Sequence, residues 1–298
     1  MATISNSNFR RFNFPSGSHA SWYAGDPASI VLFNEFFGVQ APPALDVPVV
    51  GAVVSKGYDD LDSATTSAIT TQATTSILVF AQWETTSTPP TITDSKGNTY
   101  GAPLRTTAPG GGSITNFTGV WFITGATGGS AHTFTATGLS DTFPSIWVVE
   151  VVDGGSITHI GGTALASPYN SGNLVTTGDT LLIGFAGAEN TTTVTHTINT
   201  AGFTKIPGIE ITNGAAAWTG VVAERSAAAG TYNFEVGVTS SQDGSSILVA
   251  IAKGVVSDAG YVPVWLGSWQ RKPAKVWTGA AWVIKPAKRY DGATFVTT

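Results

Sequence analysis

The sequence predicts an all-β fold built as an antiparallel β-sandwich, and three observations support this. Thr, Ser and Gly are abundant, and only 11% of the 298 residues are charged, a composition that favours strands and tight turns over helices. Apolar runs of strand length recur between Gly- and Pro-rich breaks such as 109–112. The middle of the chain also repeats itself, as a duplicated sandwich would.

Residues 1–45 differ from the rest and form the first of three predicted regions. Aromatic residues crowd this segment, and the stretch from Asp26 to Gly38 is the best helix candidate in the chain. It starts with an Asp that can cap a helix, has Pro27 in the first turn and ends at a glycine. We predict an aromatic docking segment that packs on its own sandwich or in a larger assembly.

The second region, residues 46–256, carries a predicted internal duplication of about 100 residues. Residues 69–99 align without gaps on residues 174–204, at an offset of 105 that places Gly97 on Gly202. Farther along, the offset falls to 101.

At that second offset, Val120 aligns with Val221. The two units would span about 46–154 and 155–256. They would form either two sandwiches or one continuous body, and we favour one body.

Strand signals recur within these units. Tyr232–Val238 alternates between apolar and polar residues, as a strand with one face in a core should. Residues 120–123 and 146–152 are nearly continuous apolar runs, which indicate central strands covered on both faces.

The order of these signals carries a resemblance. Residues 181–185 (LLIGF), 94–100 (DSKGNTY), 230–234 (GTYNF) and 247–252 (ILVAIA) resemble the duplicated jelly-roll-type β modules of bacterial surface proteins and phage structural proteins. The resemblance implies a jelly-roll-like sandwich and supports the fold more than any activity.

The third region, residues 257–298, contains a tandem repeat with a period of 13 residues. Residues 272–284 are followed at once by residues 285–296, and each copy reads as a β-hairpin joined to the next by Lys-Pro. We predict two-residue turns, Thr278–Gly279 in the first copy and Asp291–Gly292 in the second.

A turn at 278–279 would place Trp277 opposite Ala280 and Lys275 opposite Trp282, with all four residues on one face. That face suits burial against a partner or cation–π contacts. A two-stranded hairpin alone is marginal in water, so we expect another subunit to cover it. The predicted partner-binding residues are Lys275, Trp277, Trp282, Lys288, Tyr290 and Phe295.

This ending resembles the Lys-Pro and Trp-x-Gly-x-x-Trp repeats that close many minor tail proteins of tailed bacteriophages. Residues 265–269 (WLGSW) read as an earlier, degenerate copy with one residue missing. The resemblance implies a virion protein assembled in the host cytoplasm, with other virion proteins and further copies of the chain as partners.

The formal net charge of −5 is unevenly distributed. Residues 271–298 hold six of the 14 Lys and Arg residues and one of the 19 acidic residues, so this end carries +5 and the remaining chain −10. An acidic body with a basic tail favours association between copies or with an acidic neighbour. We predict no nucleic-acid partner, because the basic patch is short and no binding motif surrounds it.

Some classes of site and segment are excluded by the composition, although it does not determine the redox compartment. Cysteine is absent, which excludes disulfides and thiolate metal sites. No apolar run approaches the ~20 residues of a membrane helix, and no signal peptide is visible, so we predict no membrane insertion.

We predict no cofactor and no metal site. Residues 94–98 include Asp, Ser, Gly and Asn in the manner of a calcium loop, but a β-turn explains them better. The four histidines show no metal-ligand spacing: His19, His132, His159 and His196.

We also predict no catalytic activity, and the strongest rival hypothesis is a polysaccharide-degrading enzyme. Such an enzyme needs two carboxylates about 5–10 Å apart. The candidates in or beside apolar strands are Glu84, Glu150, Glu189 and Glu224. Glu84 and Glu189 occupy equivalent points of the duplication, which favours a structural role, whereas Ile251 stands where a counterpart of Glu150 would be.

The sequence therefore predicts a non-enzymatic structural component of a tailed-phage virion, a minor tail or fibre-type protein displayed as a homo-oligomer. The first alternative is a receptor- or glycan-binding module on the tail tip or capsid that contacts a host surface glycan. Its ligand loops would be 85–117 and 186–217. The sequence does not name the aromatic platforms of such a module. Trp83, Trp121 and Trp147 have the rings to stack on sugars in the enzyme hypothesis, although Trp147 reads better as a core residue.

Overall fold

In a computed structural model of the chain, the structure describes residues 45–254 with short gaps, and six strands between residues 261 and 297. The predicted aromatic segment up to residue 44, with its helix from Asp26 to Gly38, lies outside the described residues. Every regular element that the structure describes is a β-strand, which confirms the all-β prediction. The gaps in the body are 59–61, 85, 109–115, 139–140, 165, 190–191, 214–217 and 240–242.

The first half of the body has eight strands in two antiparallel sheets. They are β1 (Val49–Lys56), β2 (Ser63–Thr65), β3 (Thr74–Trp83), β4 (Thr91–Asp94), β5 (Arg105–Thr107), β6 (Phe117–Thr127), β7 (Phe134–Thr137) and β8 (Ser145–Val152). The larger sheet has the order β1-β8-β3-β6-β5, and the smaller sheet has the order β2-β7-β4. This is a jelly-roll arrangement in which the fifth strand joins the edge of the larger sheet.

The second half of the body has ten strands. They are β9 (Gly154–Ala164), β10 (Tyr169–Asn170), β11 (Leu174–Thr176), β12 (Thr180–Glu189), β13 (His196–Ile198), β14 (Thr204–Lys205), β15 (Trp218–Ala227), β16 (Gly230–Tyr232), β17 (Glu235–Val238) and β18 (Gly244–Lys253). The larger sheet has the order β9-β18-β12-β15-β14, the smaller one β10-β17-β13, and β11 pairs with β16 as an additional ribbon. Apart from that ribbon, the strand order matches that of the first half, while the duplication itself stays a prediction.

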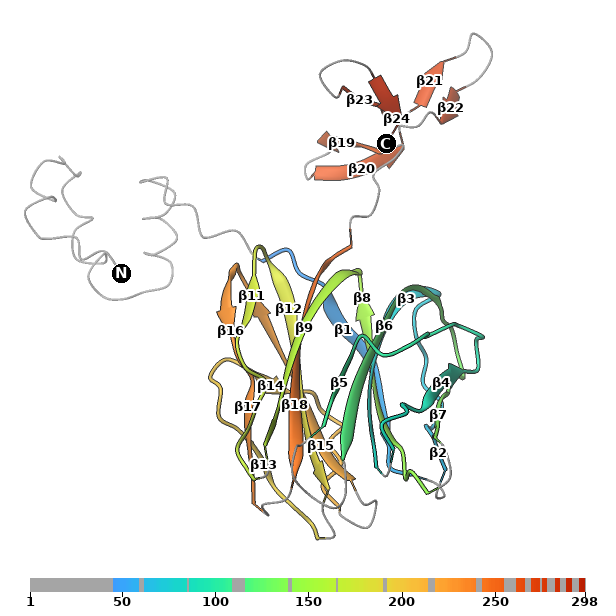
Figure 1. The fold of residues 1–298 in the computed structure, drawn as a ribbon. Helices are drawn as coiled ribbons and strands as arrows, with labels where there is room; N and C mark the ends of the chain where they lie inside the picture. Colours follow the sequence, from blue (N-terminus) through green and yellow to red (C-terminus); the bar gives the residue numbers. More distant parts are fainter. Residues whose placement is uncertain are drawn as a thin grey trace, which may run out of the picture. The chain divides into compact units, whose positions relative to one another are not determined.

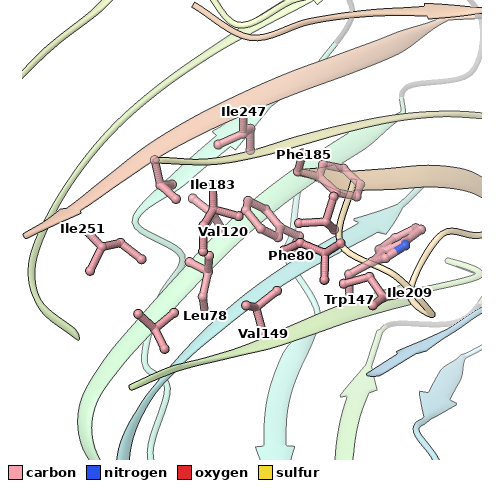
Figure 2. Close-up of a cluster of buried hydrophobic side chains, with 14 of the residues drawn as sticks. Leu78, Phe80, Val120, Trp147, Val149, Ile183, Phe185, Ile209, Ile247 and Ile251 are labelled. Carbon is pink, nitrogen blue, oxygen red and sulfur yellow. The ribbon is translucent and has the colours of Figure 1, made fainter. Parts of the chain in front are cut away.

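The two larger sheets pack against each other and share one apolar core (Figure 1). Leu78, Phe80 and Trp147 enter this core from the first half, and Ile183 and Phe185 enter it from the second (Figure 2). The body is therefore two sandwiches joined into one by a common core. The sequence allowed these two descriptions as alternatives, and the structure combines them.

Strand β3 shows how consecutive residues serve two cores. Leu78 and Phe80 face the shared core, whereas Ile77 and Val79 face the core between the two sheets of the first half. Because successive side chains of a strand point to opposite faces, a strand buried on both faces must be apolar throughout. This confirms the prediction that residues 146–152, in β8, form a central strand covered on both sides.

The alignment of the two halves holds in one part and fails in another. Gly97 and Gly202, aligned at offset 105, both have positive φ angles, 77° and 87°, which glycine adopts without strain. Val120 faces the shared core, but Val221 faces the core within the second half. The predicted offset of 101 is therefore wrong here, because a shift of one residue moves a strand position to the other face.

One predicted strand is divided in two. The alternating stretch Tyr232–Val238 spans the end of β16 and all of β17, which belong to different sheets. Phe234 lies between them and is buried, and its N–H donates to the Ser171 hydroxyl at 2.9 Å. The alternation is real within β17, where Val236 and Val238 are buried, yet it continues through a break in the sheet.

Three further hairpins come after the body. Their strands are β19 (Tyr261–Trp265) with β20 (Trp269–Pro273), β21 (Lys275–Trp277) with β22 (Trp282–Ile284), and β23 (Lys288–Tyr290) with β24 (Phe295–Thr297). Among the described residues, no helix is long and apolar enough to cross a membrane.

Candidate functional site

The predicted partner-binding residues lie in the last two hairpins, and the backbone register of these hairpins is described. In β21 and β22, Trp277 pairs with Trp282 and Lys275 with Ile284. The prediction of Lys275 opposite Trp282 is therefore wrong, by a register shift of two residues. Four residues, not two, separate the paired tryptophans, and the observed register sets two aromatic positions directly opposite each other.

Aromatic residues also pair directly in the two neighbouring hairpins. In β23 and β24, Tyr290 pairs with Phe295, and Lys288 pairs with Thr297. In the first hairpin, Trp265 pairs with Trp269 across a connection that is one residue shorter than in the second hairpin. Each hairpin is therefore closed by an aromatic pair, and cross-strand aromatic pairs are among the more stabilising ones.

Positions that pair directly in an antiparallel ladder belong to one face of the ribbon. Trp277 and Trp282 are thus placed on one face together with Lys275, as the sequence predicted, and Val276 and Val283 on the other. The surroundings of the predicted partner-binding residues lie outside the described part of the chain, so their role stays a prediction.

Glu150, the strongest catalytic candidate, has a structural role in the body. It is 3% exposed on β8, and its carboxylate accepts hydrogen bonds from the N–H of Ala52 at 2.8 Å and of Gln72 at 2.6 Å. Ala52 lies where the register of β1 against β8 shifts, which leaves a bulge. Glu150 therefore connects β8 to the bulge of β1 and to the segment that precedes β3. Each of its two carboxylate oxygens accepts a hydrogen bond.

Glu84 and Glu189 come together at one end of the shared core. Glu84 follows β3 and Glu189 ends β12, so each half of the body supplies one carboxylate. Burial raises the pKa of Glu84 above its ordinary value, and the negative charge of Glu189 raises it further. Asn116 donates from Nδ2 to Glu189 Oε2 at 3.1 Å. Sequence reasoning found that the two glutamates are equivalent but missed that they are neighbours.

The turn predicted at 94–98 is observed. Asp94 Oδ1 accepts from the N–H of Lys96 at 2.9 Å and of Asn98 at 3.1 Å. Its Oδ2 accepts from Asn98 Nδ2 at 2.8 Å and Tyr100 Oη at 2.7 Å, and His132 Nε2 lies 3.2 Å away. Although burial acts to raise it, these hydrogen bonds lower the pKa of Asp94. Protein donors thus occupy the carboxylate that a calcium ion would need.

The described histidines differ in their surroundings. His132 is buried, and its Nδ1 lies 2.9 Å from the hydroxyl oxygen of Thr71. Burial and the charge of Arg105 lower the pKa of His159. His19 lies outside the described residues. The described residues contain no group of three or more His, Cys, Asp or Glu that could hold a metal ion.

His196 forms a small polar cluster in the second half of the body. Its Nδ1 lies 2.9 Å from Glu210 Oε1, and Lys205 Nζ donates to both oxygens of Glu210 at 2.9 and 3.1 Å. Burial lowers the pKa of His196, against the opposing effect of Glu210. Burial acts to raise the pKa of Glu210, but the hydrogen bonds from Lys205 and His196 lower it overall.

The tryptophans considered as sugar platforms are core residues. Trp83, Trp121 and Trp147 are fully buried, which confirms the interpretation of Trp147 and removes all three as surface platforms. The segments predicted as ligand loops, 85–117 and 186–217, contain the strands β4, β5, β13 and β14.

Comparisons of this chain with protein families, with curated proteins and with solved structures found no match.

Proposed function

We propose that the chain is a structural component of a tailed-phage virion, a minor tail or fibre-type protein that joins other virion proteins and copies of itself through its C-terminal hairpins. The observation that carries the proposal is the row of three consecutive hairpins, each closed by a directly paired couple of aromatic residues. This regularity supports a repeated contact rather than three unrelated turns.

The hairpins have the physical properties of an association element. Each has strands of only three to five residues, and such a ribbon needs a surface to cover it before it is stable in water. Their aromatic residues offer large apolar area for that contact, and the net charge of +5 over 271–298 complements the −10 of the remaining chain. A body of one copy can therefore attract the tail of another.

The features of the body favour a structural role over a catalytic one. Its two sandwiches share a core that includes stacked rings from both halves. Glu150, the residue that a glycosidase mechanism would most readily use, accepts two backbone hydrogen bonds instead of facing a cleft. These observations support a scaffold whose contacts lie outside the sandwich.

Glycan binding is the second candidate, and one observation favours it. A groove of about 220 Å³ between β9, β11 and β18 is lined by hydroxyls and a carboxylate, including Thr158, Thr176, Asp179 and Thr180. Such groups hydrogen-bond sugar hydroxyls, although none of the described residues that line the groove is aromatic. Binding on a glycan array that is lost in Asp179→Asn would support this candidate.

The experiment for assembly compares the full chain with a chain truncated after residue 258. Sedimentation velocity over a concentration series should show oligomers of the full chain and monomers of the truncated chain. Circular dichroism should show the same strand content per body residue in both. Identical sedimentation of the two chains, together with equal incorporation into particles, would refute the proposal.

A further inference from the structure

The shared core becomes polar toward the end where Glu84 and Glu189 lie. At Phe80 and Phe185 the facing positions are apolar, but one step farther along β3 the inward residue is Gln82. Its neighbours in the sheet are Ser145 and Thr118, and the positions across the interface include Gly187 and Ser245. The Ser245 hydroxyl bonds the Thr118 hydroxyl from one sheet to the other. The apolar core thus ends in a polar layer.

Gln82 leaves an acceptor without a partner in that layer. Its Nε2 donates to the Thr118 hydroxyl at 3.3 Å, but its Oε1 is buried and receives no hydrogen bond from the described residues. A Cβ built on Gly187 would come within 2.4 Å of this oxygen, so the amide lies directly across from β12. Because Gly187 has no side chain, the Gln82 amide fits against it. Gly187 lies two residues before Glu189, on the same face of β12.

Asn116 leaves a second acceptor at the same place. The side chain is 4% exposed, and its Nδ2 donates to Glu189 while its Oδ1 is buried without a partner among the described residues. Flipping the amide would set its oxygen against the carboxylate, so this orientation is the favourable one. Leaving a buried acceptor without a hydrogen bond is unfavourable, and one explanation for such an atom is a bound ion.

The charges at this end point to a cation rather than to another ligand. Glu84 and Glu189 are both partly exposed, so an ion from solvent can reach them. No ion pair among the described residues involves either of them. Phe80 stacks on Phe185 and Gln82 lies against Gly187, so Glu84 and Glu189, two residues farther along the same faces of their strands, lie next to each other.

We propose that Glu84, Glu189 and Asn116 bind a divalent cation of the calcium class at the junction of the two halves. Two carboxylates and an amide carbonyl are oxygen ligands, which hard cations prefer, whereas zinc and copper favour nitrogen and sulfur. Gln82 Oε1 lies in the layer beneath and supplies a further oxygen. Because each half contributes one glutamate, the ion bridges the two sandwiches.

This site went unrecognised in the sequence for a physical reason. Its ligands are separated by up to 105 positions, so no short motif contains them. Only the packing of the two larger sheets brings the end of β3 beside the end of β12. The proposal is independent of the proposed virion function, because a calcium-binding sandwich can serve many roles.

The test uses the full chain after removal of divalent ions with EDTA. Isothermal titration with calcium chloride should show one site per chain, and the melting temperature should rise by roughly 5 °C at calcium about 100 times its Kd. Magnesium should bind more weakly, because it demands a regular octahedral site and gives up water reluctantly.

The double variant Glu84→Gln with Glu189→Gln should be at least as stable as the wild type without calcium and less stable than the wild type with calcium. Without calcium it should melt at or above the wild type, because two like charges have been removed, and with calcium it should show no rise. The matched control is Glu224→Gln, which removes another half-buried carboxylate whose pKa is raised by burial alone. The control should keep the calcium response of the wild type.

Two outcomes would overturn the proposal. One is a wild-type chain whose melting temperature and titration heat do not respond to calcium, magnesium or manganese. The other is a calcium response that persists in the double variant, which would place the ion elsewhere.

Discussion

Phe80 and Phe185 stack across the junction between the two sandwiches, with ring centroids 5.0 Å apart and 14° between the ring planes. One ring comes from β3 and the other from β12, at positions that the sequence alignment makes equivalent. Trp147 meets Phe185 edge-on at 4.9 Å. Each half therefore completes the core of the other.

The first prediction concerns this stack. Phe80→Ala should destabilise the body by about 3–5 kcal/mol, because it removes a buried ring and leaves a cavity in a core that both halves line. Urea unfolding should remain a single transition in the wild type and in the variant. The control is Val175→Ala, at a side chain that is 65% exposed, which should change stability by no more than about 0.5 kcal/mol. Two separate transitions in the wild type would contradict a shared core.

The second prediction concerns Glu150. Glu150→Gln should lower the free energy of unfolding by about 1–3 kcal/mol, because the amide retains one acceptor and turns an NH₂ group toward a backbone N–H. Chemical denaturation measures the loss. Glu235→Gln serves as control, since that carboxylate accepts from two asparagine amides near the surface and should matter less. An unchanged stability in Glu150→Gln would mean that the bulge of β1 holds without it.

The third prediction concerns the hairpins. Trp277→Ala combined with Trp282→Ala should weaken self-association or incorporation into particles at least tenfold, because the second hairpin loses its closing pair. Sedimentation equilibrium gives the association constant, and the melting temperature of the body should stay the same. Val276→Ala with Val283→Ala changes the opposite face of the same ribbon and should weaken association less. Equal losses in both double variants would indicate that ribbon stability, not the aromatic face, governs assembly.

The fourth prediction concerns pH. Burial keeps the pKa of His196 below its ordinary value, so the unfolded chain takes up a proton that the folded chain resists. The contribution of His196 to stability should therefore be fully present above a pH of about 6.5. It should be lost as the pH falls from that value toward the folded pKa. His196→Gln should flatten the dependence of the unfolding free energy on pH just below about 6.5. A slope that is unchanged in this variant would assign the effect to other groups.

A second loss is expected at lower pH. The folded pKa values of Asp94 and Glu210 are lowered, so their contributions are present above the ordinary carboxyl pKa values of about 4 and vanish as the pH falls below them. Asp94→Asn should remove part of this second loss, which acid titration of the circular dichroism signal would show.

Local patterns predicted the strands better than their arrangement. Continuous apolar runs such as 146–152 correctly indicated strands covered on both faces, because period and burial are properties of the strand itself. The alternation over Tyr232–Val238 did not reveal its break, since Phe234 is buried whether or not it belongs to a ladder. The sequence also could not fix the exact offset that aligns the two halves near Val120. The residues around Val120 are apolar and match equally well at similar offsets.

The chemistry of the candidate site was harder to predict. Residues 94–98 could be interpreted as a turn because the hydrogen bonds that define it join residues close in sequence. Glu150 stood out in the sequence because Ile251 replaces it in the second half. Its structural role could not be predicted, because its partners, the N–H groups of Ala52 and Gln72, belong to segments far before it in the chain. Likewise, the nearness of Glu84 and Glu189 depends on how two sheets pack, and no residue pattern within either strand expresses that.

The ion pair between Asp46 and Lys253 has a mechanical consequence. Asp46 precedes the first strand of the body and Lys253 ends the last one, so the polypeptide enters and leaves the double sandwich at adjacent points. Tension applied through the two flanking segments of the chain would separate these points without stretching the sheets between them. The folded body would then lie to one side of the line of force, and its sheets would not carry the tension along their length.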